Sequence, residues 1–353
     1  FLLDKDPEGN YQLSSEKSNF LIALLSTLWK GGSNPRASNT TSQPDLTPAE
    51  RAIFQLMLPG YYQHLNNHQD TLYPGMHSFY HFLRRYHAEH SSDSEYQSEI
   101  NYFDVEQLLL TLKPFVSGKY QAVLNAAQEL DISENTLVCF DLDKINSDPV
   151  LYPVVTLLIT ELALDQIRKY PDQIKYLYLD EAWAMLSGSL QEFIEDLFRT
   201  IRKNNGSVSI ITQGLEEIKK SSVGEAILVN AATKIILKHE DERLIEELAR
   251  HLGFTEHEVD LIKSIRVAQD YRELFIKQGE EARVYVLETS PHLDAVLSSK
   301  PQERNYLRKL IDYYHGNFPH AVNQFVESKA FKRGAGSWEL GAGSWELGAG
   351  SWE

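Results

Sequence analysis

The sequence predicts an α/β fold, in which helices cover both faces of a parallel β-sheet, together with an all-helical block. Two observations indicate this. The second half of the chain alternates short apolar runs with amphipathic helical segments. Residues 48–130, in contrast, show helical patterns only. A chain of 353 residues, 42% of them apolar, is long enough for about two domains with a sizeable core.

The expected elements begin with the run Phe1-Leu2-Leu3-Asp4, a strand end that enters a polar loop. An apolar helix follows at 19–30, so residues 1–30 are assigned to the start of the sheet domain. Residues 31–47 are mostly turn-forming and predict a flexible linker. We find neither a signal peptide nor the roughly 18 uncharged apolar residues that a membrane span needs.

The helical block has a clear starting signal in Thr47-Pro48-Ala49-Glu50, which combines a threonine N-cap, an N-terminal proline and a glutamate at the third position. Helical patterns then cover 51–66, 77–89 and 105–115. We interpret residues 48–130 as an all-helical insertion into the sheet domain.

The remaining chain predicts the rest of the sheet domain at 131–300 and a closing helical segment at 301–333. Residues 334–353 repeat Gly-Ala-Gly-Ser-Trp-Glu-Leu and are interpreted as an added linker or tag, with a docking peptide as the alternative. The expected strands are 137–142, 175–180, 207–212, 234–239 and 283–288, and the expected helices are 151–168, 191–203, 240–252 and 256–264.

Composition narrows the class of protein. The formal net charge of −16 argues against a surface that binds nucleic acid broadly, although it does not exclude a local basic groove. The single cysteine, Cys139, excludes an intrachain disulfide framework and is typical of a reducing compartment such as the cytoplasm.

The motif with the clearest chemistry ends the expected strand at 175–180. Its apolar and aromatic residues run into Asp180 and Glu181, as in the Walker B strands of ATPases with a catalytic glutamate. A buried parallel strand holds its carboxyl end at the sheet edge where α/β proteins bind ligands. There an aspartate can hold Mg²⁺, and the adjacent glutamate can polarise the attacking water. The alternative is a strand that simply ends in a solvated acidic turn.

Three further residues are candidates for contacting a nucleotide. Gln213 follows the neighbouring expected strand at 207–212 and could sense the γ-phosphate. Arg202, at the basic end of the preceding helix, could reach a neighbouring subunit's γ-phosphate as arginine fingers do. Arg283 lies beside another strand. Each also has a structural interpretation, since polar residues cap strands and basic residues complement helix ends.

The phosphate-binding loop Gly-x-x-x-x-Gly-Lys-Ser/Thr does not occur in these residues. Ser117-Gly118-Lys119-Tyr120 comes nearest, but it lacks the first glycine and the hydroxyl residue. We therefore expect the P-loop upstream of residue 1. Without its backbone cradle and lysine, this fragment alone is expected to bind ATP weakly or not at all and to be inactive.

Histidines are concentrated in the helical block, where His64 with His68 and His77 with His81 form i,i+4 pairs. Such pairs can bind a metal ion, but no cysteine or carboxylate partner is fixed by their spacing. Apart from Mg²⁺ held with a nucleotide at Asp180, no metal site is predicted.

Taken together, these motifs resemble the C-terminal ATPase domain of the large ATPases of conjugative type IV secretion systems, especially the TraG-type proteins of conjugative transposons. The resemblance covers residues 1–300. The helix start at Leu46-Thr47-Pro48-Ala49-Glu50 and the helical insertion are its most specific features. Its other motifs are Asp4 with Glu8-Gly9-Asn10-Tyr11, Phe140-Asp141-Leu142, Leu179-Asp180-Glu181-Ala182-Trp183, Arg202-Lys203-Asn204 and Thr212-Gln213.

The resemblance implies a RecA-like P-loop NTPase core, ATP and Mg²⁺ as cofactors, and assembly into a hexamer. It also implies action at the cytoplasmic face of the inner membrane, with other secretion components, to power pilus assembly or the transfer of DNA or protein. By position, Asp180 becomes the magnesium residue and Glu181 the catalytic base. Gln213 becomes the γ-phosphate sensor, and Arg202 contributes at a subunit interface.

Two other functions stay open at this point. A hexameric DNA-pumping motor or coupling protein would share the same core, and salt-dependent DNA binding would distinguish it. A non-catalytic scaffold of the secretion machine would have no physical need for Glu181.

Overall fold

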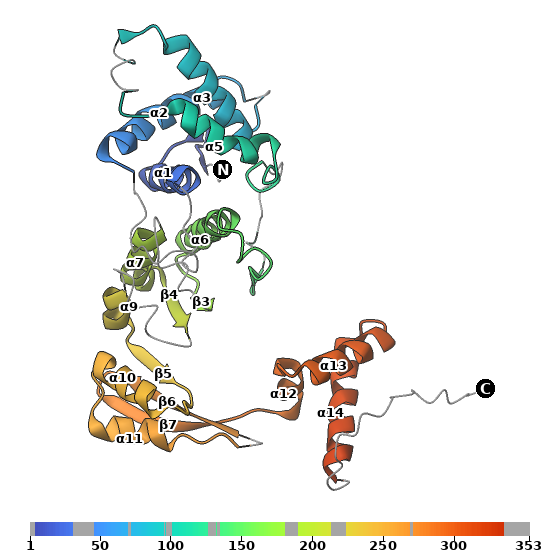
Figure 1. Cartoon of the computed structure of the whole chain (residues 1–353). Helices are drawn as coiled ribbons and strands as arrows, with labels where there is room; N and C mark the ends of the chain where they lie inside the picture. Colours follow the sequence, from blue (N-terminus) through green and yellow to red (C-terminus); the bar gives the residue numbers. More distant parts are fainter. Residues whose placement is uncertain are drawn as a thin grey trace, which may run out of the picture. The chain divides into compact units, whose positions relative to one another are not determined.

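The computed structural model divides the chain into two compact units, Phe1–Ala231 and Ala232–Glu353 (Figure 1). The structure describes residues 4–30, 46–69, 72–94, 96, 101–125, 132, 135–180, 190–212, 224–268 and 271–334. The expected linker at 31–47 lies outside these residues except for its last two positions, and the repeat tail lies outside them from residue 335 onward.

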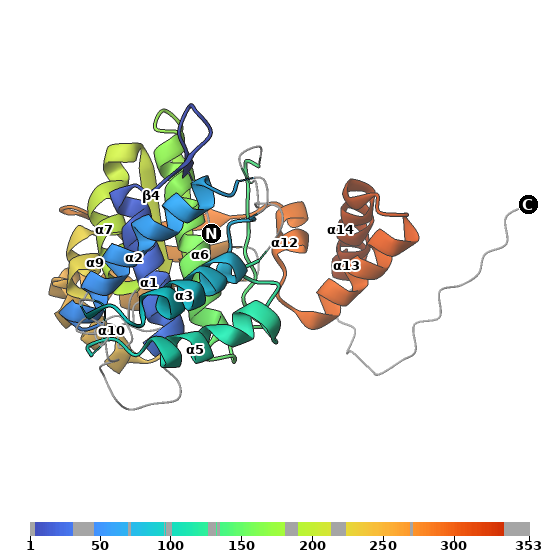
Figure 2. The same cartoon turned by 90° about the horizontal axis from the view of Figure 1, so that it is seen from above.

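The first unit begins with a short antiparallel hairpin and a bundle of helices that bury a shared set of apolar side chains, among them Phe20, Phe54 and Phe115. Helices α3 and α5 lie side by side in both views (Figures 1 and 2). The bounds are β1 (Asp4–Lys5), β2 (Tyr11–Gln12), α1 (Ser15–Lys30), α2 (Pro48–Asn66), α3 (Met76–His90) and α5 (Val105–Ser117).

The start of α2 confirms the capping signal in the sequence. The Thr47 hydroxyl accepts a hydrogen bond from the Glu50 N–H at 3.2 Å, and the Glu50 carboxylate accepts one from the Thr47 N–H at 2.8 Å. Helix α5 begins on a similar cap, since Asp104 accepts a hydrogen bond from the Gln107 N–H at 2.8 Å. The three expected helices of the block are thus confirmed.

The core of the bundle extends beyond the expected helical block. It includes residues of α1 and also Val154 and Leu157 of α6 (Leu151–Lys169). The buried Lys17 of α1 donates a hydrogen bond to the buried Glu161 of α6 at 3.0 Å. The helical block is therefore anchored on the helix that leads into the next strand.

That strand, β3 (Lys175–Asp180), pairs in parallel with β4 (Gly206–Ile211), so that Lys175 lies opposite Gly206 and Asp180 opposite Ile211. The segment between them contains α7 (Leu190–Thr200) and the one-turn 3₁₀ helix η2 (Ile201–Asn204). A helical crossover between parallel strands is the unit from which α/β folds are built. These two expected strands and their parallel pairing are confirmed.

The second unit contains an antiparallel sheet of order β5-β6-β7, and Phe275 of β6 packs with Ile245 and Ile262 of two helices. A second small core around Leu307 and Phe325 joins the last three helices. Helix α9 (Gly224–Asn230) ends the first unit. The elements of the second unit are β5 (Thr233–Ile236), α10 (Glu242–Leu252), α11 (Glu256–Ser264), β6 (Tyr271–Gln278), β7 (Glu281–Glu288), α12 (Pro291–Leu297), α13 (Pro301–Tyr313) and α14 (Phe318–Gly334).

The expected strand at 137–142 is wrong. These residues form no strand, and the side chain of Leu137 is 88% exposed. An apolar run becomes a strand only where a neighbouring strand satisfies its backbone hydrogen bonds. In the described part of the chain, no strand pairs with it.

The expected strands at 234–239 and 283–288 exist as β5 and β7, but they do not join β3 and β4 in a parallel sheet. Both pair antiparallel with β6, which the sequence analysis missed because Arg272, Glu273 and Lys277 interrupt its apolar pattern. The available signal was the short connection Gly279-Glu280, in which Gly279 has a φ of 59°. Two-residue turns with a left-handed glycine are typical of β-hairpins.

Among the described residues, no helix combines the length and the apolar character that a membrane span needs.

Candidate functional site

The site expected from the sequence is centred on the carboxyl end of β3. Asp180 is the last residue of this strand, and its side chain is exposed. Leu179 directly before it is buried, so the strand end is anchored while the carboxylate remains accessible. Because β3 and β4 run in parallel, their carboxyl ends meet at one edge of the sheet, the edge where ligands bind in α/β folds.

Glu181 and Gln213 lie outside the described residues. In sequence, Glu181 follows Asp180 directly, and Gln213 comes two residues after Ile211, the partner of Asp180 in β4. Among the described residues, the register brings Asp180 next to Ile211.

Arg202 lies at the other end of the sheet. It belongs to η2, which precedes the first residue of β4, and its side chain is exposed. At about 3.3 Å per residue, the two ends of a six-residue strand lie roughly 16 Å apart. The structure thus places Arg202 beside the amino ends of β3 and β4, away from Asp180 in the same chain.

Arg199, in the last turn of α7, and the candidate Arg283 both have local carboxylate neighbours. Arg199 forms an ion pair with Glu195 one helical turn earlier, at 2.5 Å. Arg283 lies on β7 in the second unit, mostly exposed and 3.7 Å from the carboxylate of Glu281. Its cross-strand neighbour is Ile276, and the alternation along β6 puts this pair on the sheet face away from the buried Phe275.

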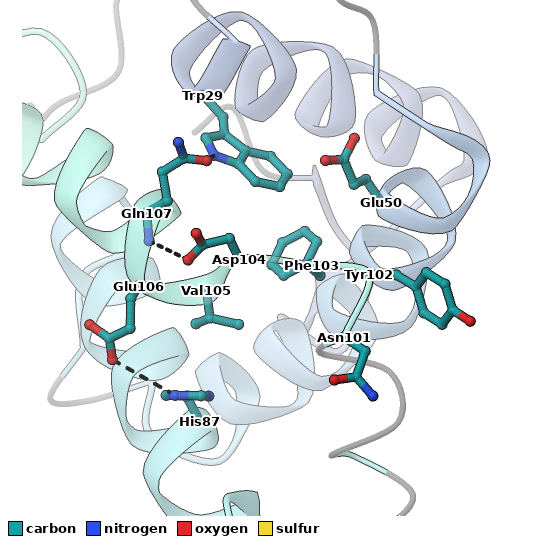
Figure 3. Close-up of a pocket in the computed structure, with 10 residues that line it drawn as sticks. All are labelled: Trp29, Glu50, His87, Asn101, Tyr102, Phe103, Asp104, Val105, Glu106 and Gln107. Carbon is teal, nitrogen blue, oxygen red and sulfur yellow. Dashed lines mark hydrogen bonds and ion pairs between the residues drawn. The ribbon is translucent and has the colours of Figure 1, made fainter.

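A cavity of about 580 Å³ that no sequence motif predicted lies beside the helical block (Figure 3). It is lined by Trp29, Glu50, His87 and the segment 101–107. The indole N–H of Trp29 donates a hydrogen bond to the side-chain oxygen of Gln107 at 3.1 Å. None of the predicted site residues lines this cavity.

Two of the carboxylates that line this cavity, those of Glu50 and Asp104, bind neighbouring groups of the protein. Lys30 contacts the Glu50 carboxylate at 2.7 Å. Burial raises the pKa of Glu50, but the hydrogen bonds from Lys30 and the Thr47 N–H outweigh this effect and lower the pKa below its usual range. Asp104 caps α5, as Figure 3 shows. We interpret the cavity as a packing feature where the ends of α1, α2, α3 and α5 meet.

The histidine pairs are engaged in local contacts. The rings of His64 and His68 lie 4.5 Å apart, as do those of His77 and His81. Arg85 lies 2.9 Å from the Nδ1 atom of His64. Burial, Arg85 and His68 together lower the pKa of His64, which favours the neutral ring.

The donor set at the sheet edge suits a hard divalent cation. An exposed carboxylate such as that of Asp180 provides the oxygen ligand that Mg²⁺ prefers, and this ion usually retains waters and binds phosphate oxygens as well. The edge residues provide no glycine-rich phosphate cradle, because the chain contains no such sequence. The exposed carboxylate of Asp180 is compatible with the predicted magnesium role, which stays a prediction.

Comparison with known proteins gives a consistent picture. The sequence model of the family described as the TraG P-loop domain matches residues 7–329. The chain is 28% identical over 139 residues to the type IV secretion system protein virB4 of Bartonella henselae, which covers 38% of this chain and 18% of that protein. It is 22% identical over 210 residues to the conjugal transfer protein TrbE of Rhizobium radiobacter, covering 58% of this chain and 25% of that protein.

A solved structure shares the fold. The structure of VirB4 from Thermoanaerobacter pseudethanolicus superimposes with a TM-score of 0.56 at 18% sequence identity, covering 79% of this chain and 70% of that one. The chain spans less than a third of the length of the two curated relatives described above.

Proposed function

Because the chain belongs to the TraG P-loop domain family, we propose that it is part of the ATPase motor of a conjugative type IV secretion system. The observation that carries this proposal is the parallel register of β3 and β4. It supports a site in which Asp180-Glu181 leaves one strand and Thr212-Gln213 leaves its neighbour at the same edge. The relatives described above are named for type IV secretion and conjugal transfer, which supports the same function.

The proposed reaction is the hydrolysis of ATP by in-line attack of water. ATP with Mg²⁺ supplies the transferable phosphoryl group and the charge that offsets negative charge in the transition state. Asp180 holds the metal ion, directly or through water. Glu181 orients the attacking water and accepts its proton. Gln213 contacts the γ-phosphate and distinguishes ATP from ADP.

Two arginines complete the proposed site. Arg202 of one subunit stabilises the phosphoryl group that is transferred in the site of its neighbour. Guanidinium groups suit this role because they match phosphate oxygens in geometry and charge. Arg283 contacts the nucleotide in the assembled protein. Residues outside this sequence supply the phosphate-binding loop, so the 353-residue chain by itself has little or no turnover.

For the whole protein we propose assembly into a hexamer that works with other secretion components at the cytoplasmic face of the inner membrane. Hydrolysis there powers pilus assembly or the transfer of DNA or protein.

The first test is steady-state ATP hydrolysis by the whole natural protein, comparing wild type with Glu181→Gln. Loss of a general base lowers the rate by about a hundredfold or more, while ATP binding is retained. Glu106→Gln provides the matched control, since Glu106 is 79% exposed in the helical block and should leave the rate unchanged.

Equal rates for wild type and Glu181→Gln would contradict the assignment of the catalytic base. No turnover in either protein would favour a scaffold without nucleotide chemistry.

A further inference from the structure

The turn that carries Arg202 is exposed, but several hydrogen bonds and a close backbone contact fix its main chain. It comprises η2 and Asn205, and it connects α7 to the first residue of β4. Arg202 and Lys203 are both exposed there. The contacts that shape this turn come from three directions: the turn's own backbone, the start of β3, and the buried side chain of Ile201.

Asn205 closes the turn from within. Its φ of 53° is left-handed, a conformation that asparagine adopts more readily than most residues other than glycine. In this conformation its backbone N–H donates a hydrogen bond to the carbonyl of Arg202 at 3.3 Å. Its side-chain amide donates another to the carbonyl of Pro171 at 2.9 Å, which ties the turn to the segment before β3.

Lys175 fixes the turn from the side of β3. Its ammonium group donates a hydrogen bond to the carbonyl of Asn204 at 3.0 Å, and its backbone N–H donates one to the carbonyl of Asn205 at 3.1 Å. The charged group of this lysine therefore holds the backbone carbonyl of Asn204 at the end of a helical turn, where positive groups are favourable.

Gly206 lets the turn fold back closely on the strand. A Cβ atom at this position would lie 2.4 Å from the Cγ1 atom of Ile201, whose side chain is buried. Only glycine allows this close approach. The main chain on both sides of Arg202 is thus fixed, although the arginine side chain itself is exposed.

We infer that Asn205 and Lys175 are positioning residues, which hold Arg202 at the amino end of the sheet so that it serves the nucleotide site of a second copy of this chain. This inference rests on the proposed ATPase function. The roughly 16 Å between the two ends of β3 separates Arg202 from its own Asp180. Unusual backbone conformations that the surroundings enforce are concentrated at functional sites, where they pre-organise a side chain.

A double-mutant cycle in the whole natural protein tests the positioning role. Asn205→Ala disfavours the left-handed turn, and we expect kcat for ATP to fall roughly ten- to a hundredfold with little change in KM. In an Arg202→Ala background the same change should have almost no further effect on kcat. Lys175→Met should behave in the same way, more weakly.

Two control variants separate positioning from folding. Asn205→Gly keeps the left-handed backbone and removes only the side-chain hydrogen bond, so its kcat should lie between those of wild type and Asn205→Ala. Asp172→Asn changes an exposed residue next to Pro171 that makes none of these contacts, and it should leave kcat unchanged. A loss of kcat that multiplies with that of Arg202→Ala, or no loss at all, would overturn the positioning role.

Subunit mixing tests the role of the second copy. Arg202→Ala and Glu181→Gln protein should each turn over slowly alone. In mixed assemblies, some sites combine an intact Glu181 with an intact Arg202 from the neighbour, so the mixture should exceed both parents in activity. A mixture that shows only the average of its parents contradicts action on a second copy. A wild-type protein without turnover instead refutes the proposed function, and this inference with it.

Discussion

At the scale of single residues, Asp148 shows how a surface carboxylate can join two helices. It contacts the ammonium group of Lys119 at 2.7 Å and accepts a hydrogen bond from the Leu151 N–H at 3.0 Å. Burial alone raises the pKa of Asp148, but the hydrogen bonds from Lys119, from the first backbone amides of α6 and from Tyr120 lower it to about 2. The carboxylate therefore connects the end of α5 to the start of α6.

The pKa of Asp148 predicts a pH dependence of stability. A carboxyl group with a lowered pKa in the folded state stabilises the fold above its unfolded pKa of about 4, and this contribution is lost as the pH falls toward about 2. Because Lys119 is mostly exposed, we expect Asp148→Asn to cost about 1 kcal/mol at pH 7. Urea unfolding of wild type and variant should show this difference at pH 7 and a smaller one near pH 3.

The matched control is Asp172→Asn, an exposed carboxylate in the turn before β3. It should leave the urea midpoint unchanged at both pH values. An equal cost of Asp148→Asn at both pH values would show that the ionised carboxylate is not the source of the stability.

The candidate site at this scale was only partly readable from the sequence. The position of Asp180 at a strand end follows from a local apolar run, and its place beside the end of β4 follows from the parallel register. The sequence placed Arg202 between an expected helix and an expected strand, but its position at the edge opposite Asp180 depends on the parallel pairing of β3 with β4. The roles of Glu181 and Gln213 stay predictions.

At the scale of elements, a buried ion pair joins α1 and α6, two helices outside the expected helical block that share its core. Lys17 and Glu161 are both almost fully buried, and Arg168 also contacts Glu161 at 3.3 Å from a more exposed position. A buried pair of this kind adds little net stability, but leaving one partner alone is costly.

This contrast gives a prediction for α1 and α6. We expect Glu161→Leu to lower the free energy of unfolding by about 3 kcal/mol, because it leaves the ammonium group of Lys17 buried without a partner. The double variant Lys17→Met with Glu161→Leu should recover most of this loss. Urea unfolding of the three proteins measures both effects, and a double variant no more stable than the single one would refute the explanation.

Elements with strong local signals were predictable. The capping box at Thr47 and Glu50 marked the start of α2 because both hydrogen bonds form within four residues. Strand pairing was harder, since partners lie far apart in sequence. The run at 137–142 has the apolar composition of a strand, but no strand pairs with it in the described part of the chain. Strand β6 pairs with β7, although charged residues interrupt its apolar pattern.

At the scale of the whole molecule, each of the two units has its own hydrophobic core. In the first unit the core centres on residues such as Phe54, and in the second it centres on Phe275. Units with separate cores need not unfold together, so a single unfolding free energy does not describe such a chain.

We therefore expect calorimetry of this chain to show more than one unfolding transition. Phe275→Ala removes a side chain with no exposed surface and should destabilise the second unit by about 3 to 5 kcal/mol, lowering one transition only. Phe54→Ala should lower a different one. A single transition that both variants shift equally would show that the units unfold as one.

The sequence by itself determined the helices of the block, the strands β3 and β4, and the family to which the chain belongs. These depend on local signals: a capping box, apolar runs of strand length, and short motifs in a fixed order. Only the tertiary structure decided that β5 and β7 pair antiparallel with β6, that α1 and α6 share the core of the helical block, and that Arg202 lies at the end of the sheet opposite Asp180. Each of these depends on contacts between residues distant in sequence, and a local sequence pattern does not indicate which distant segment it will contact.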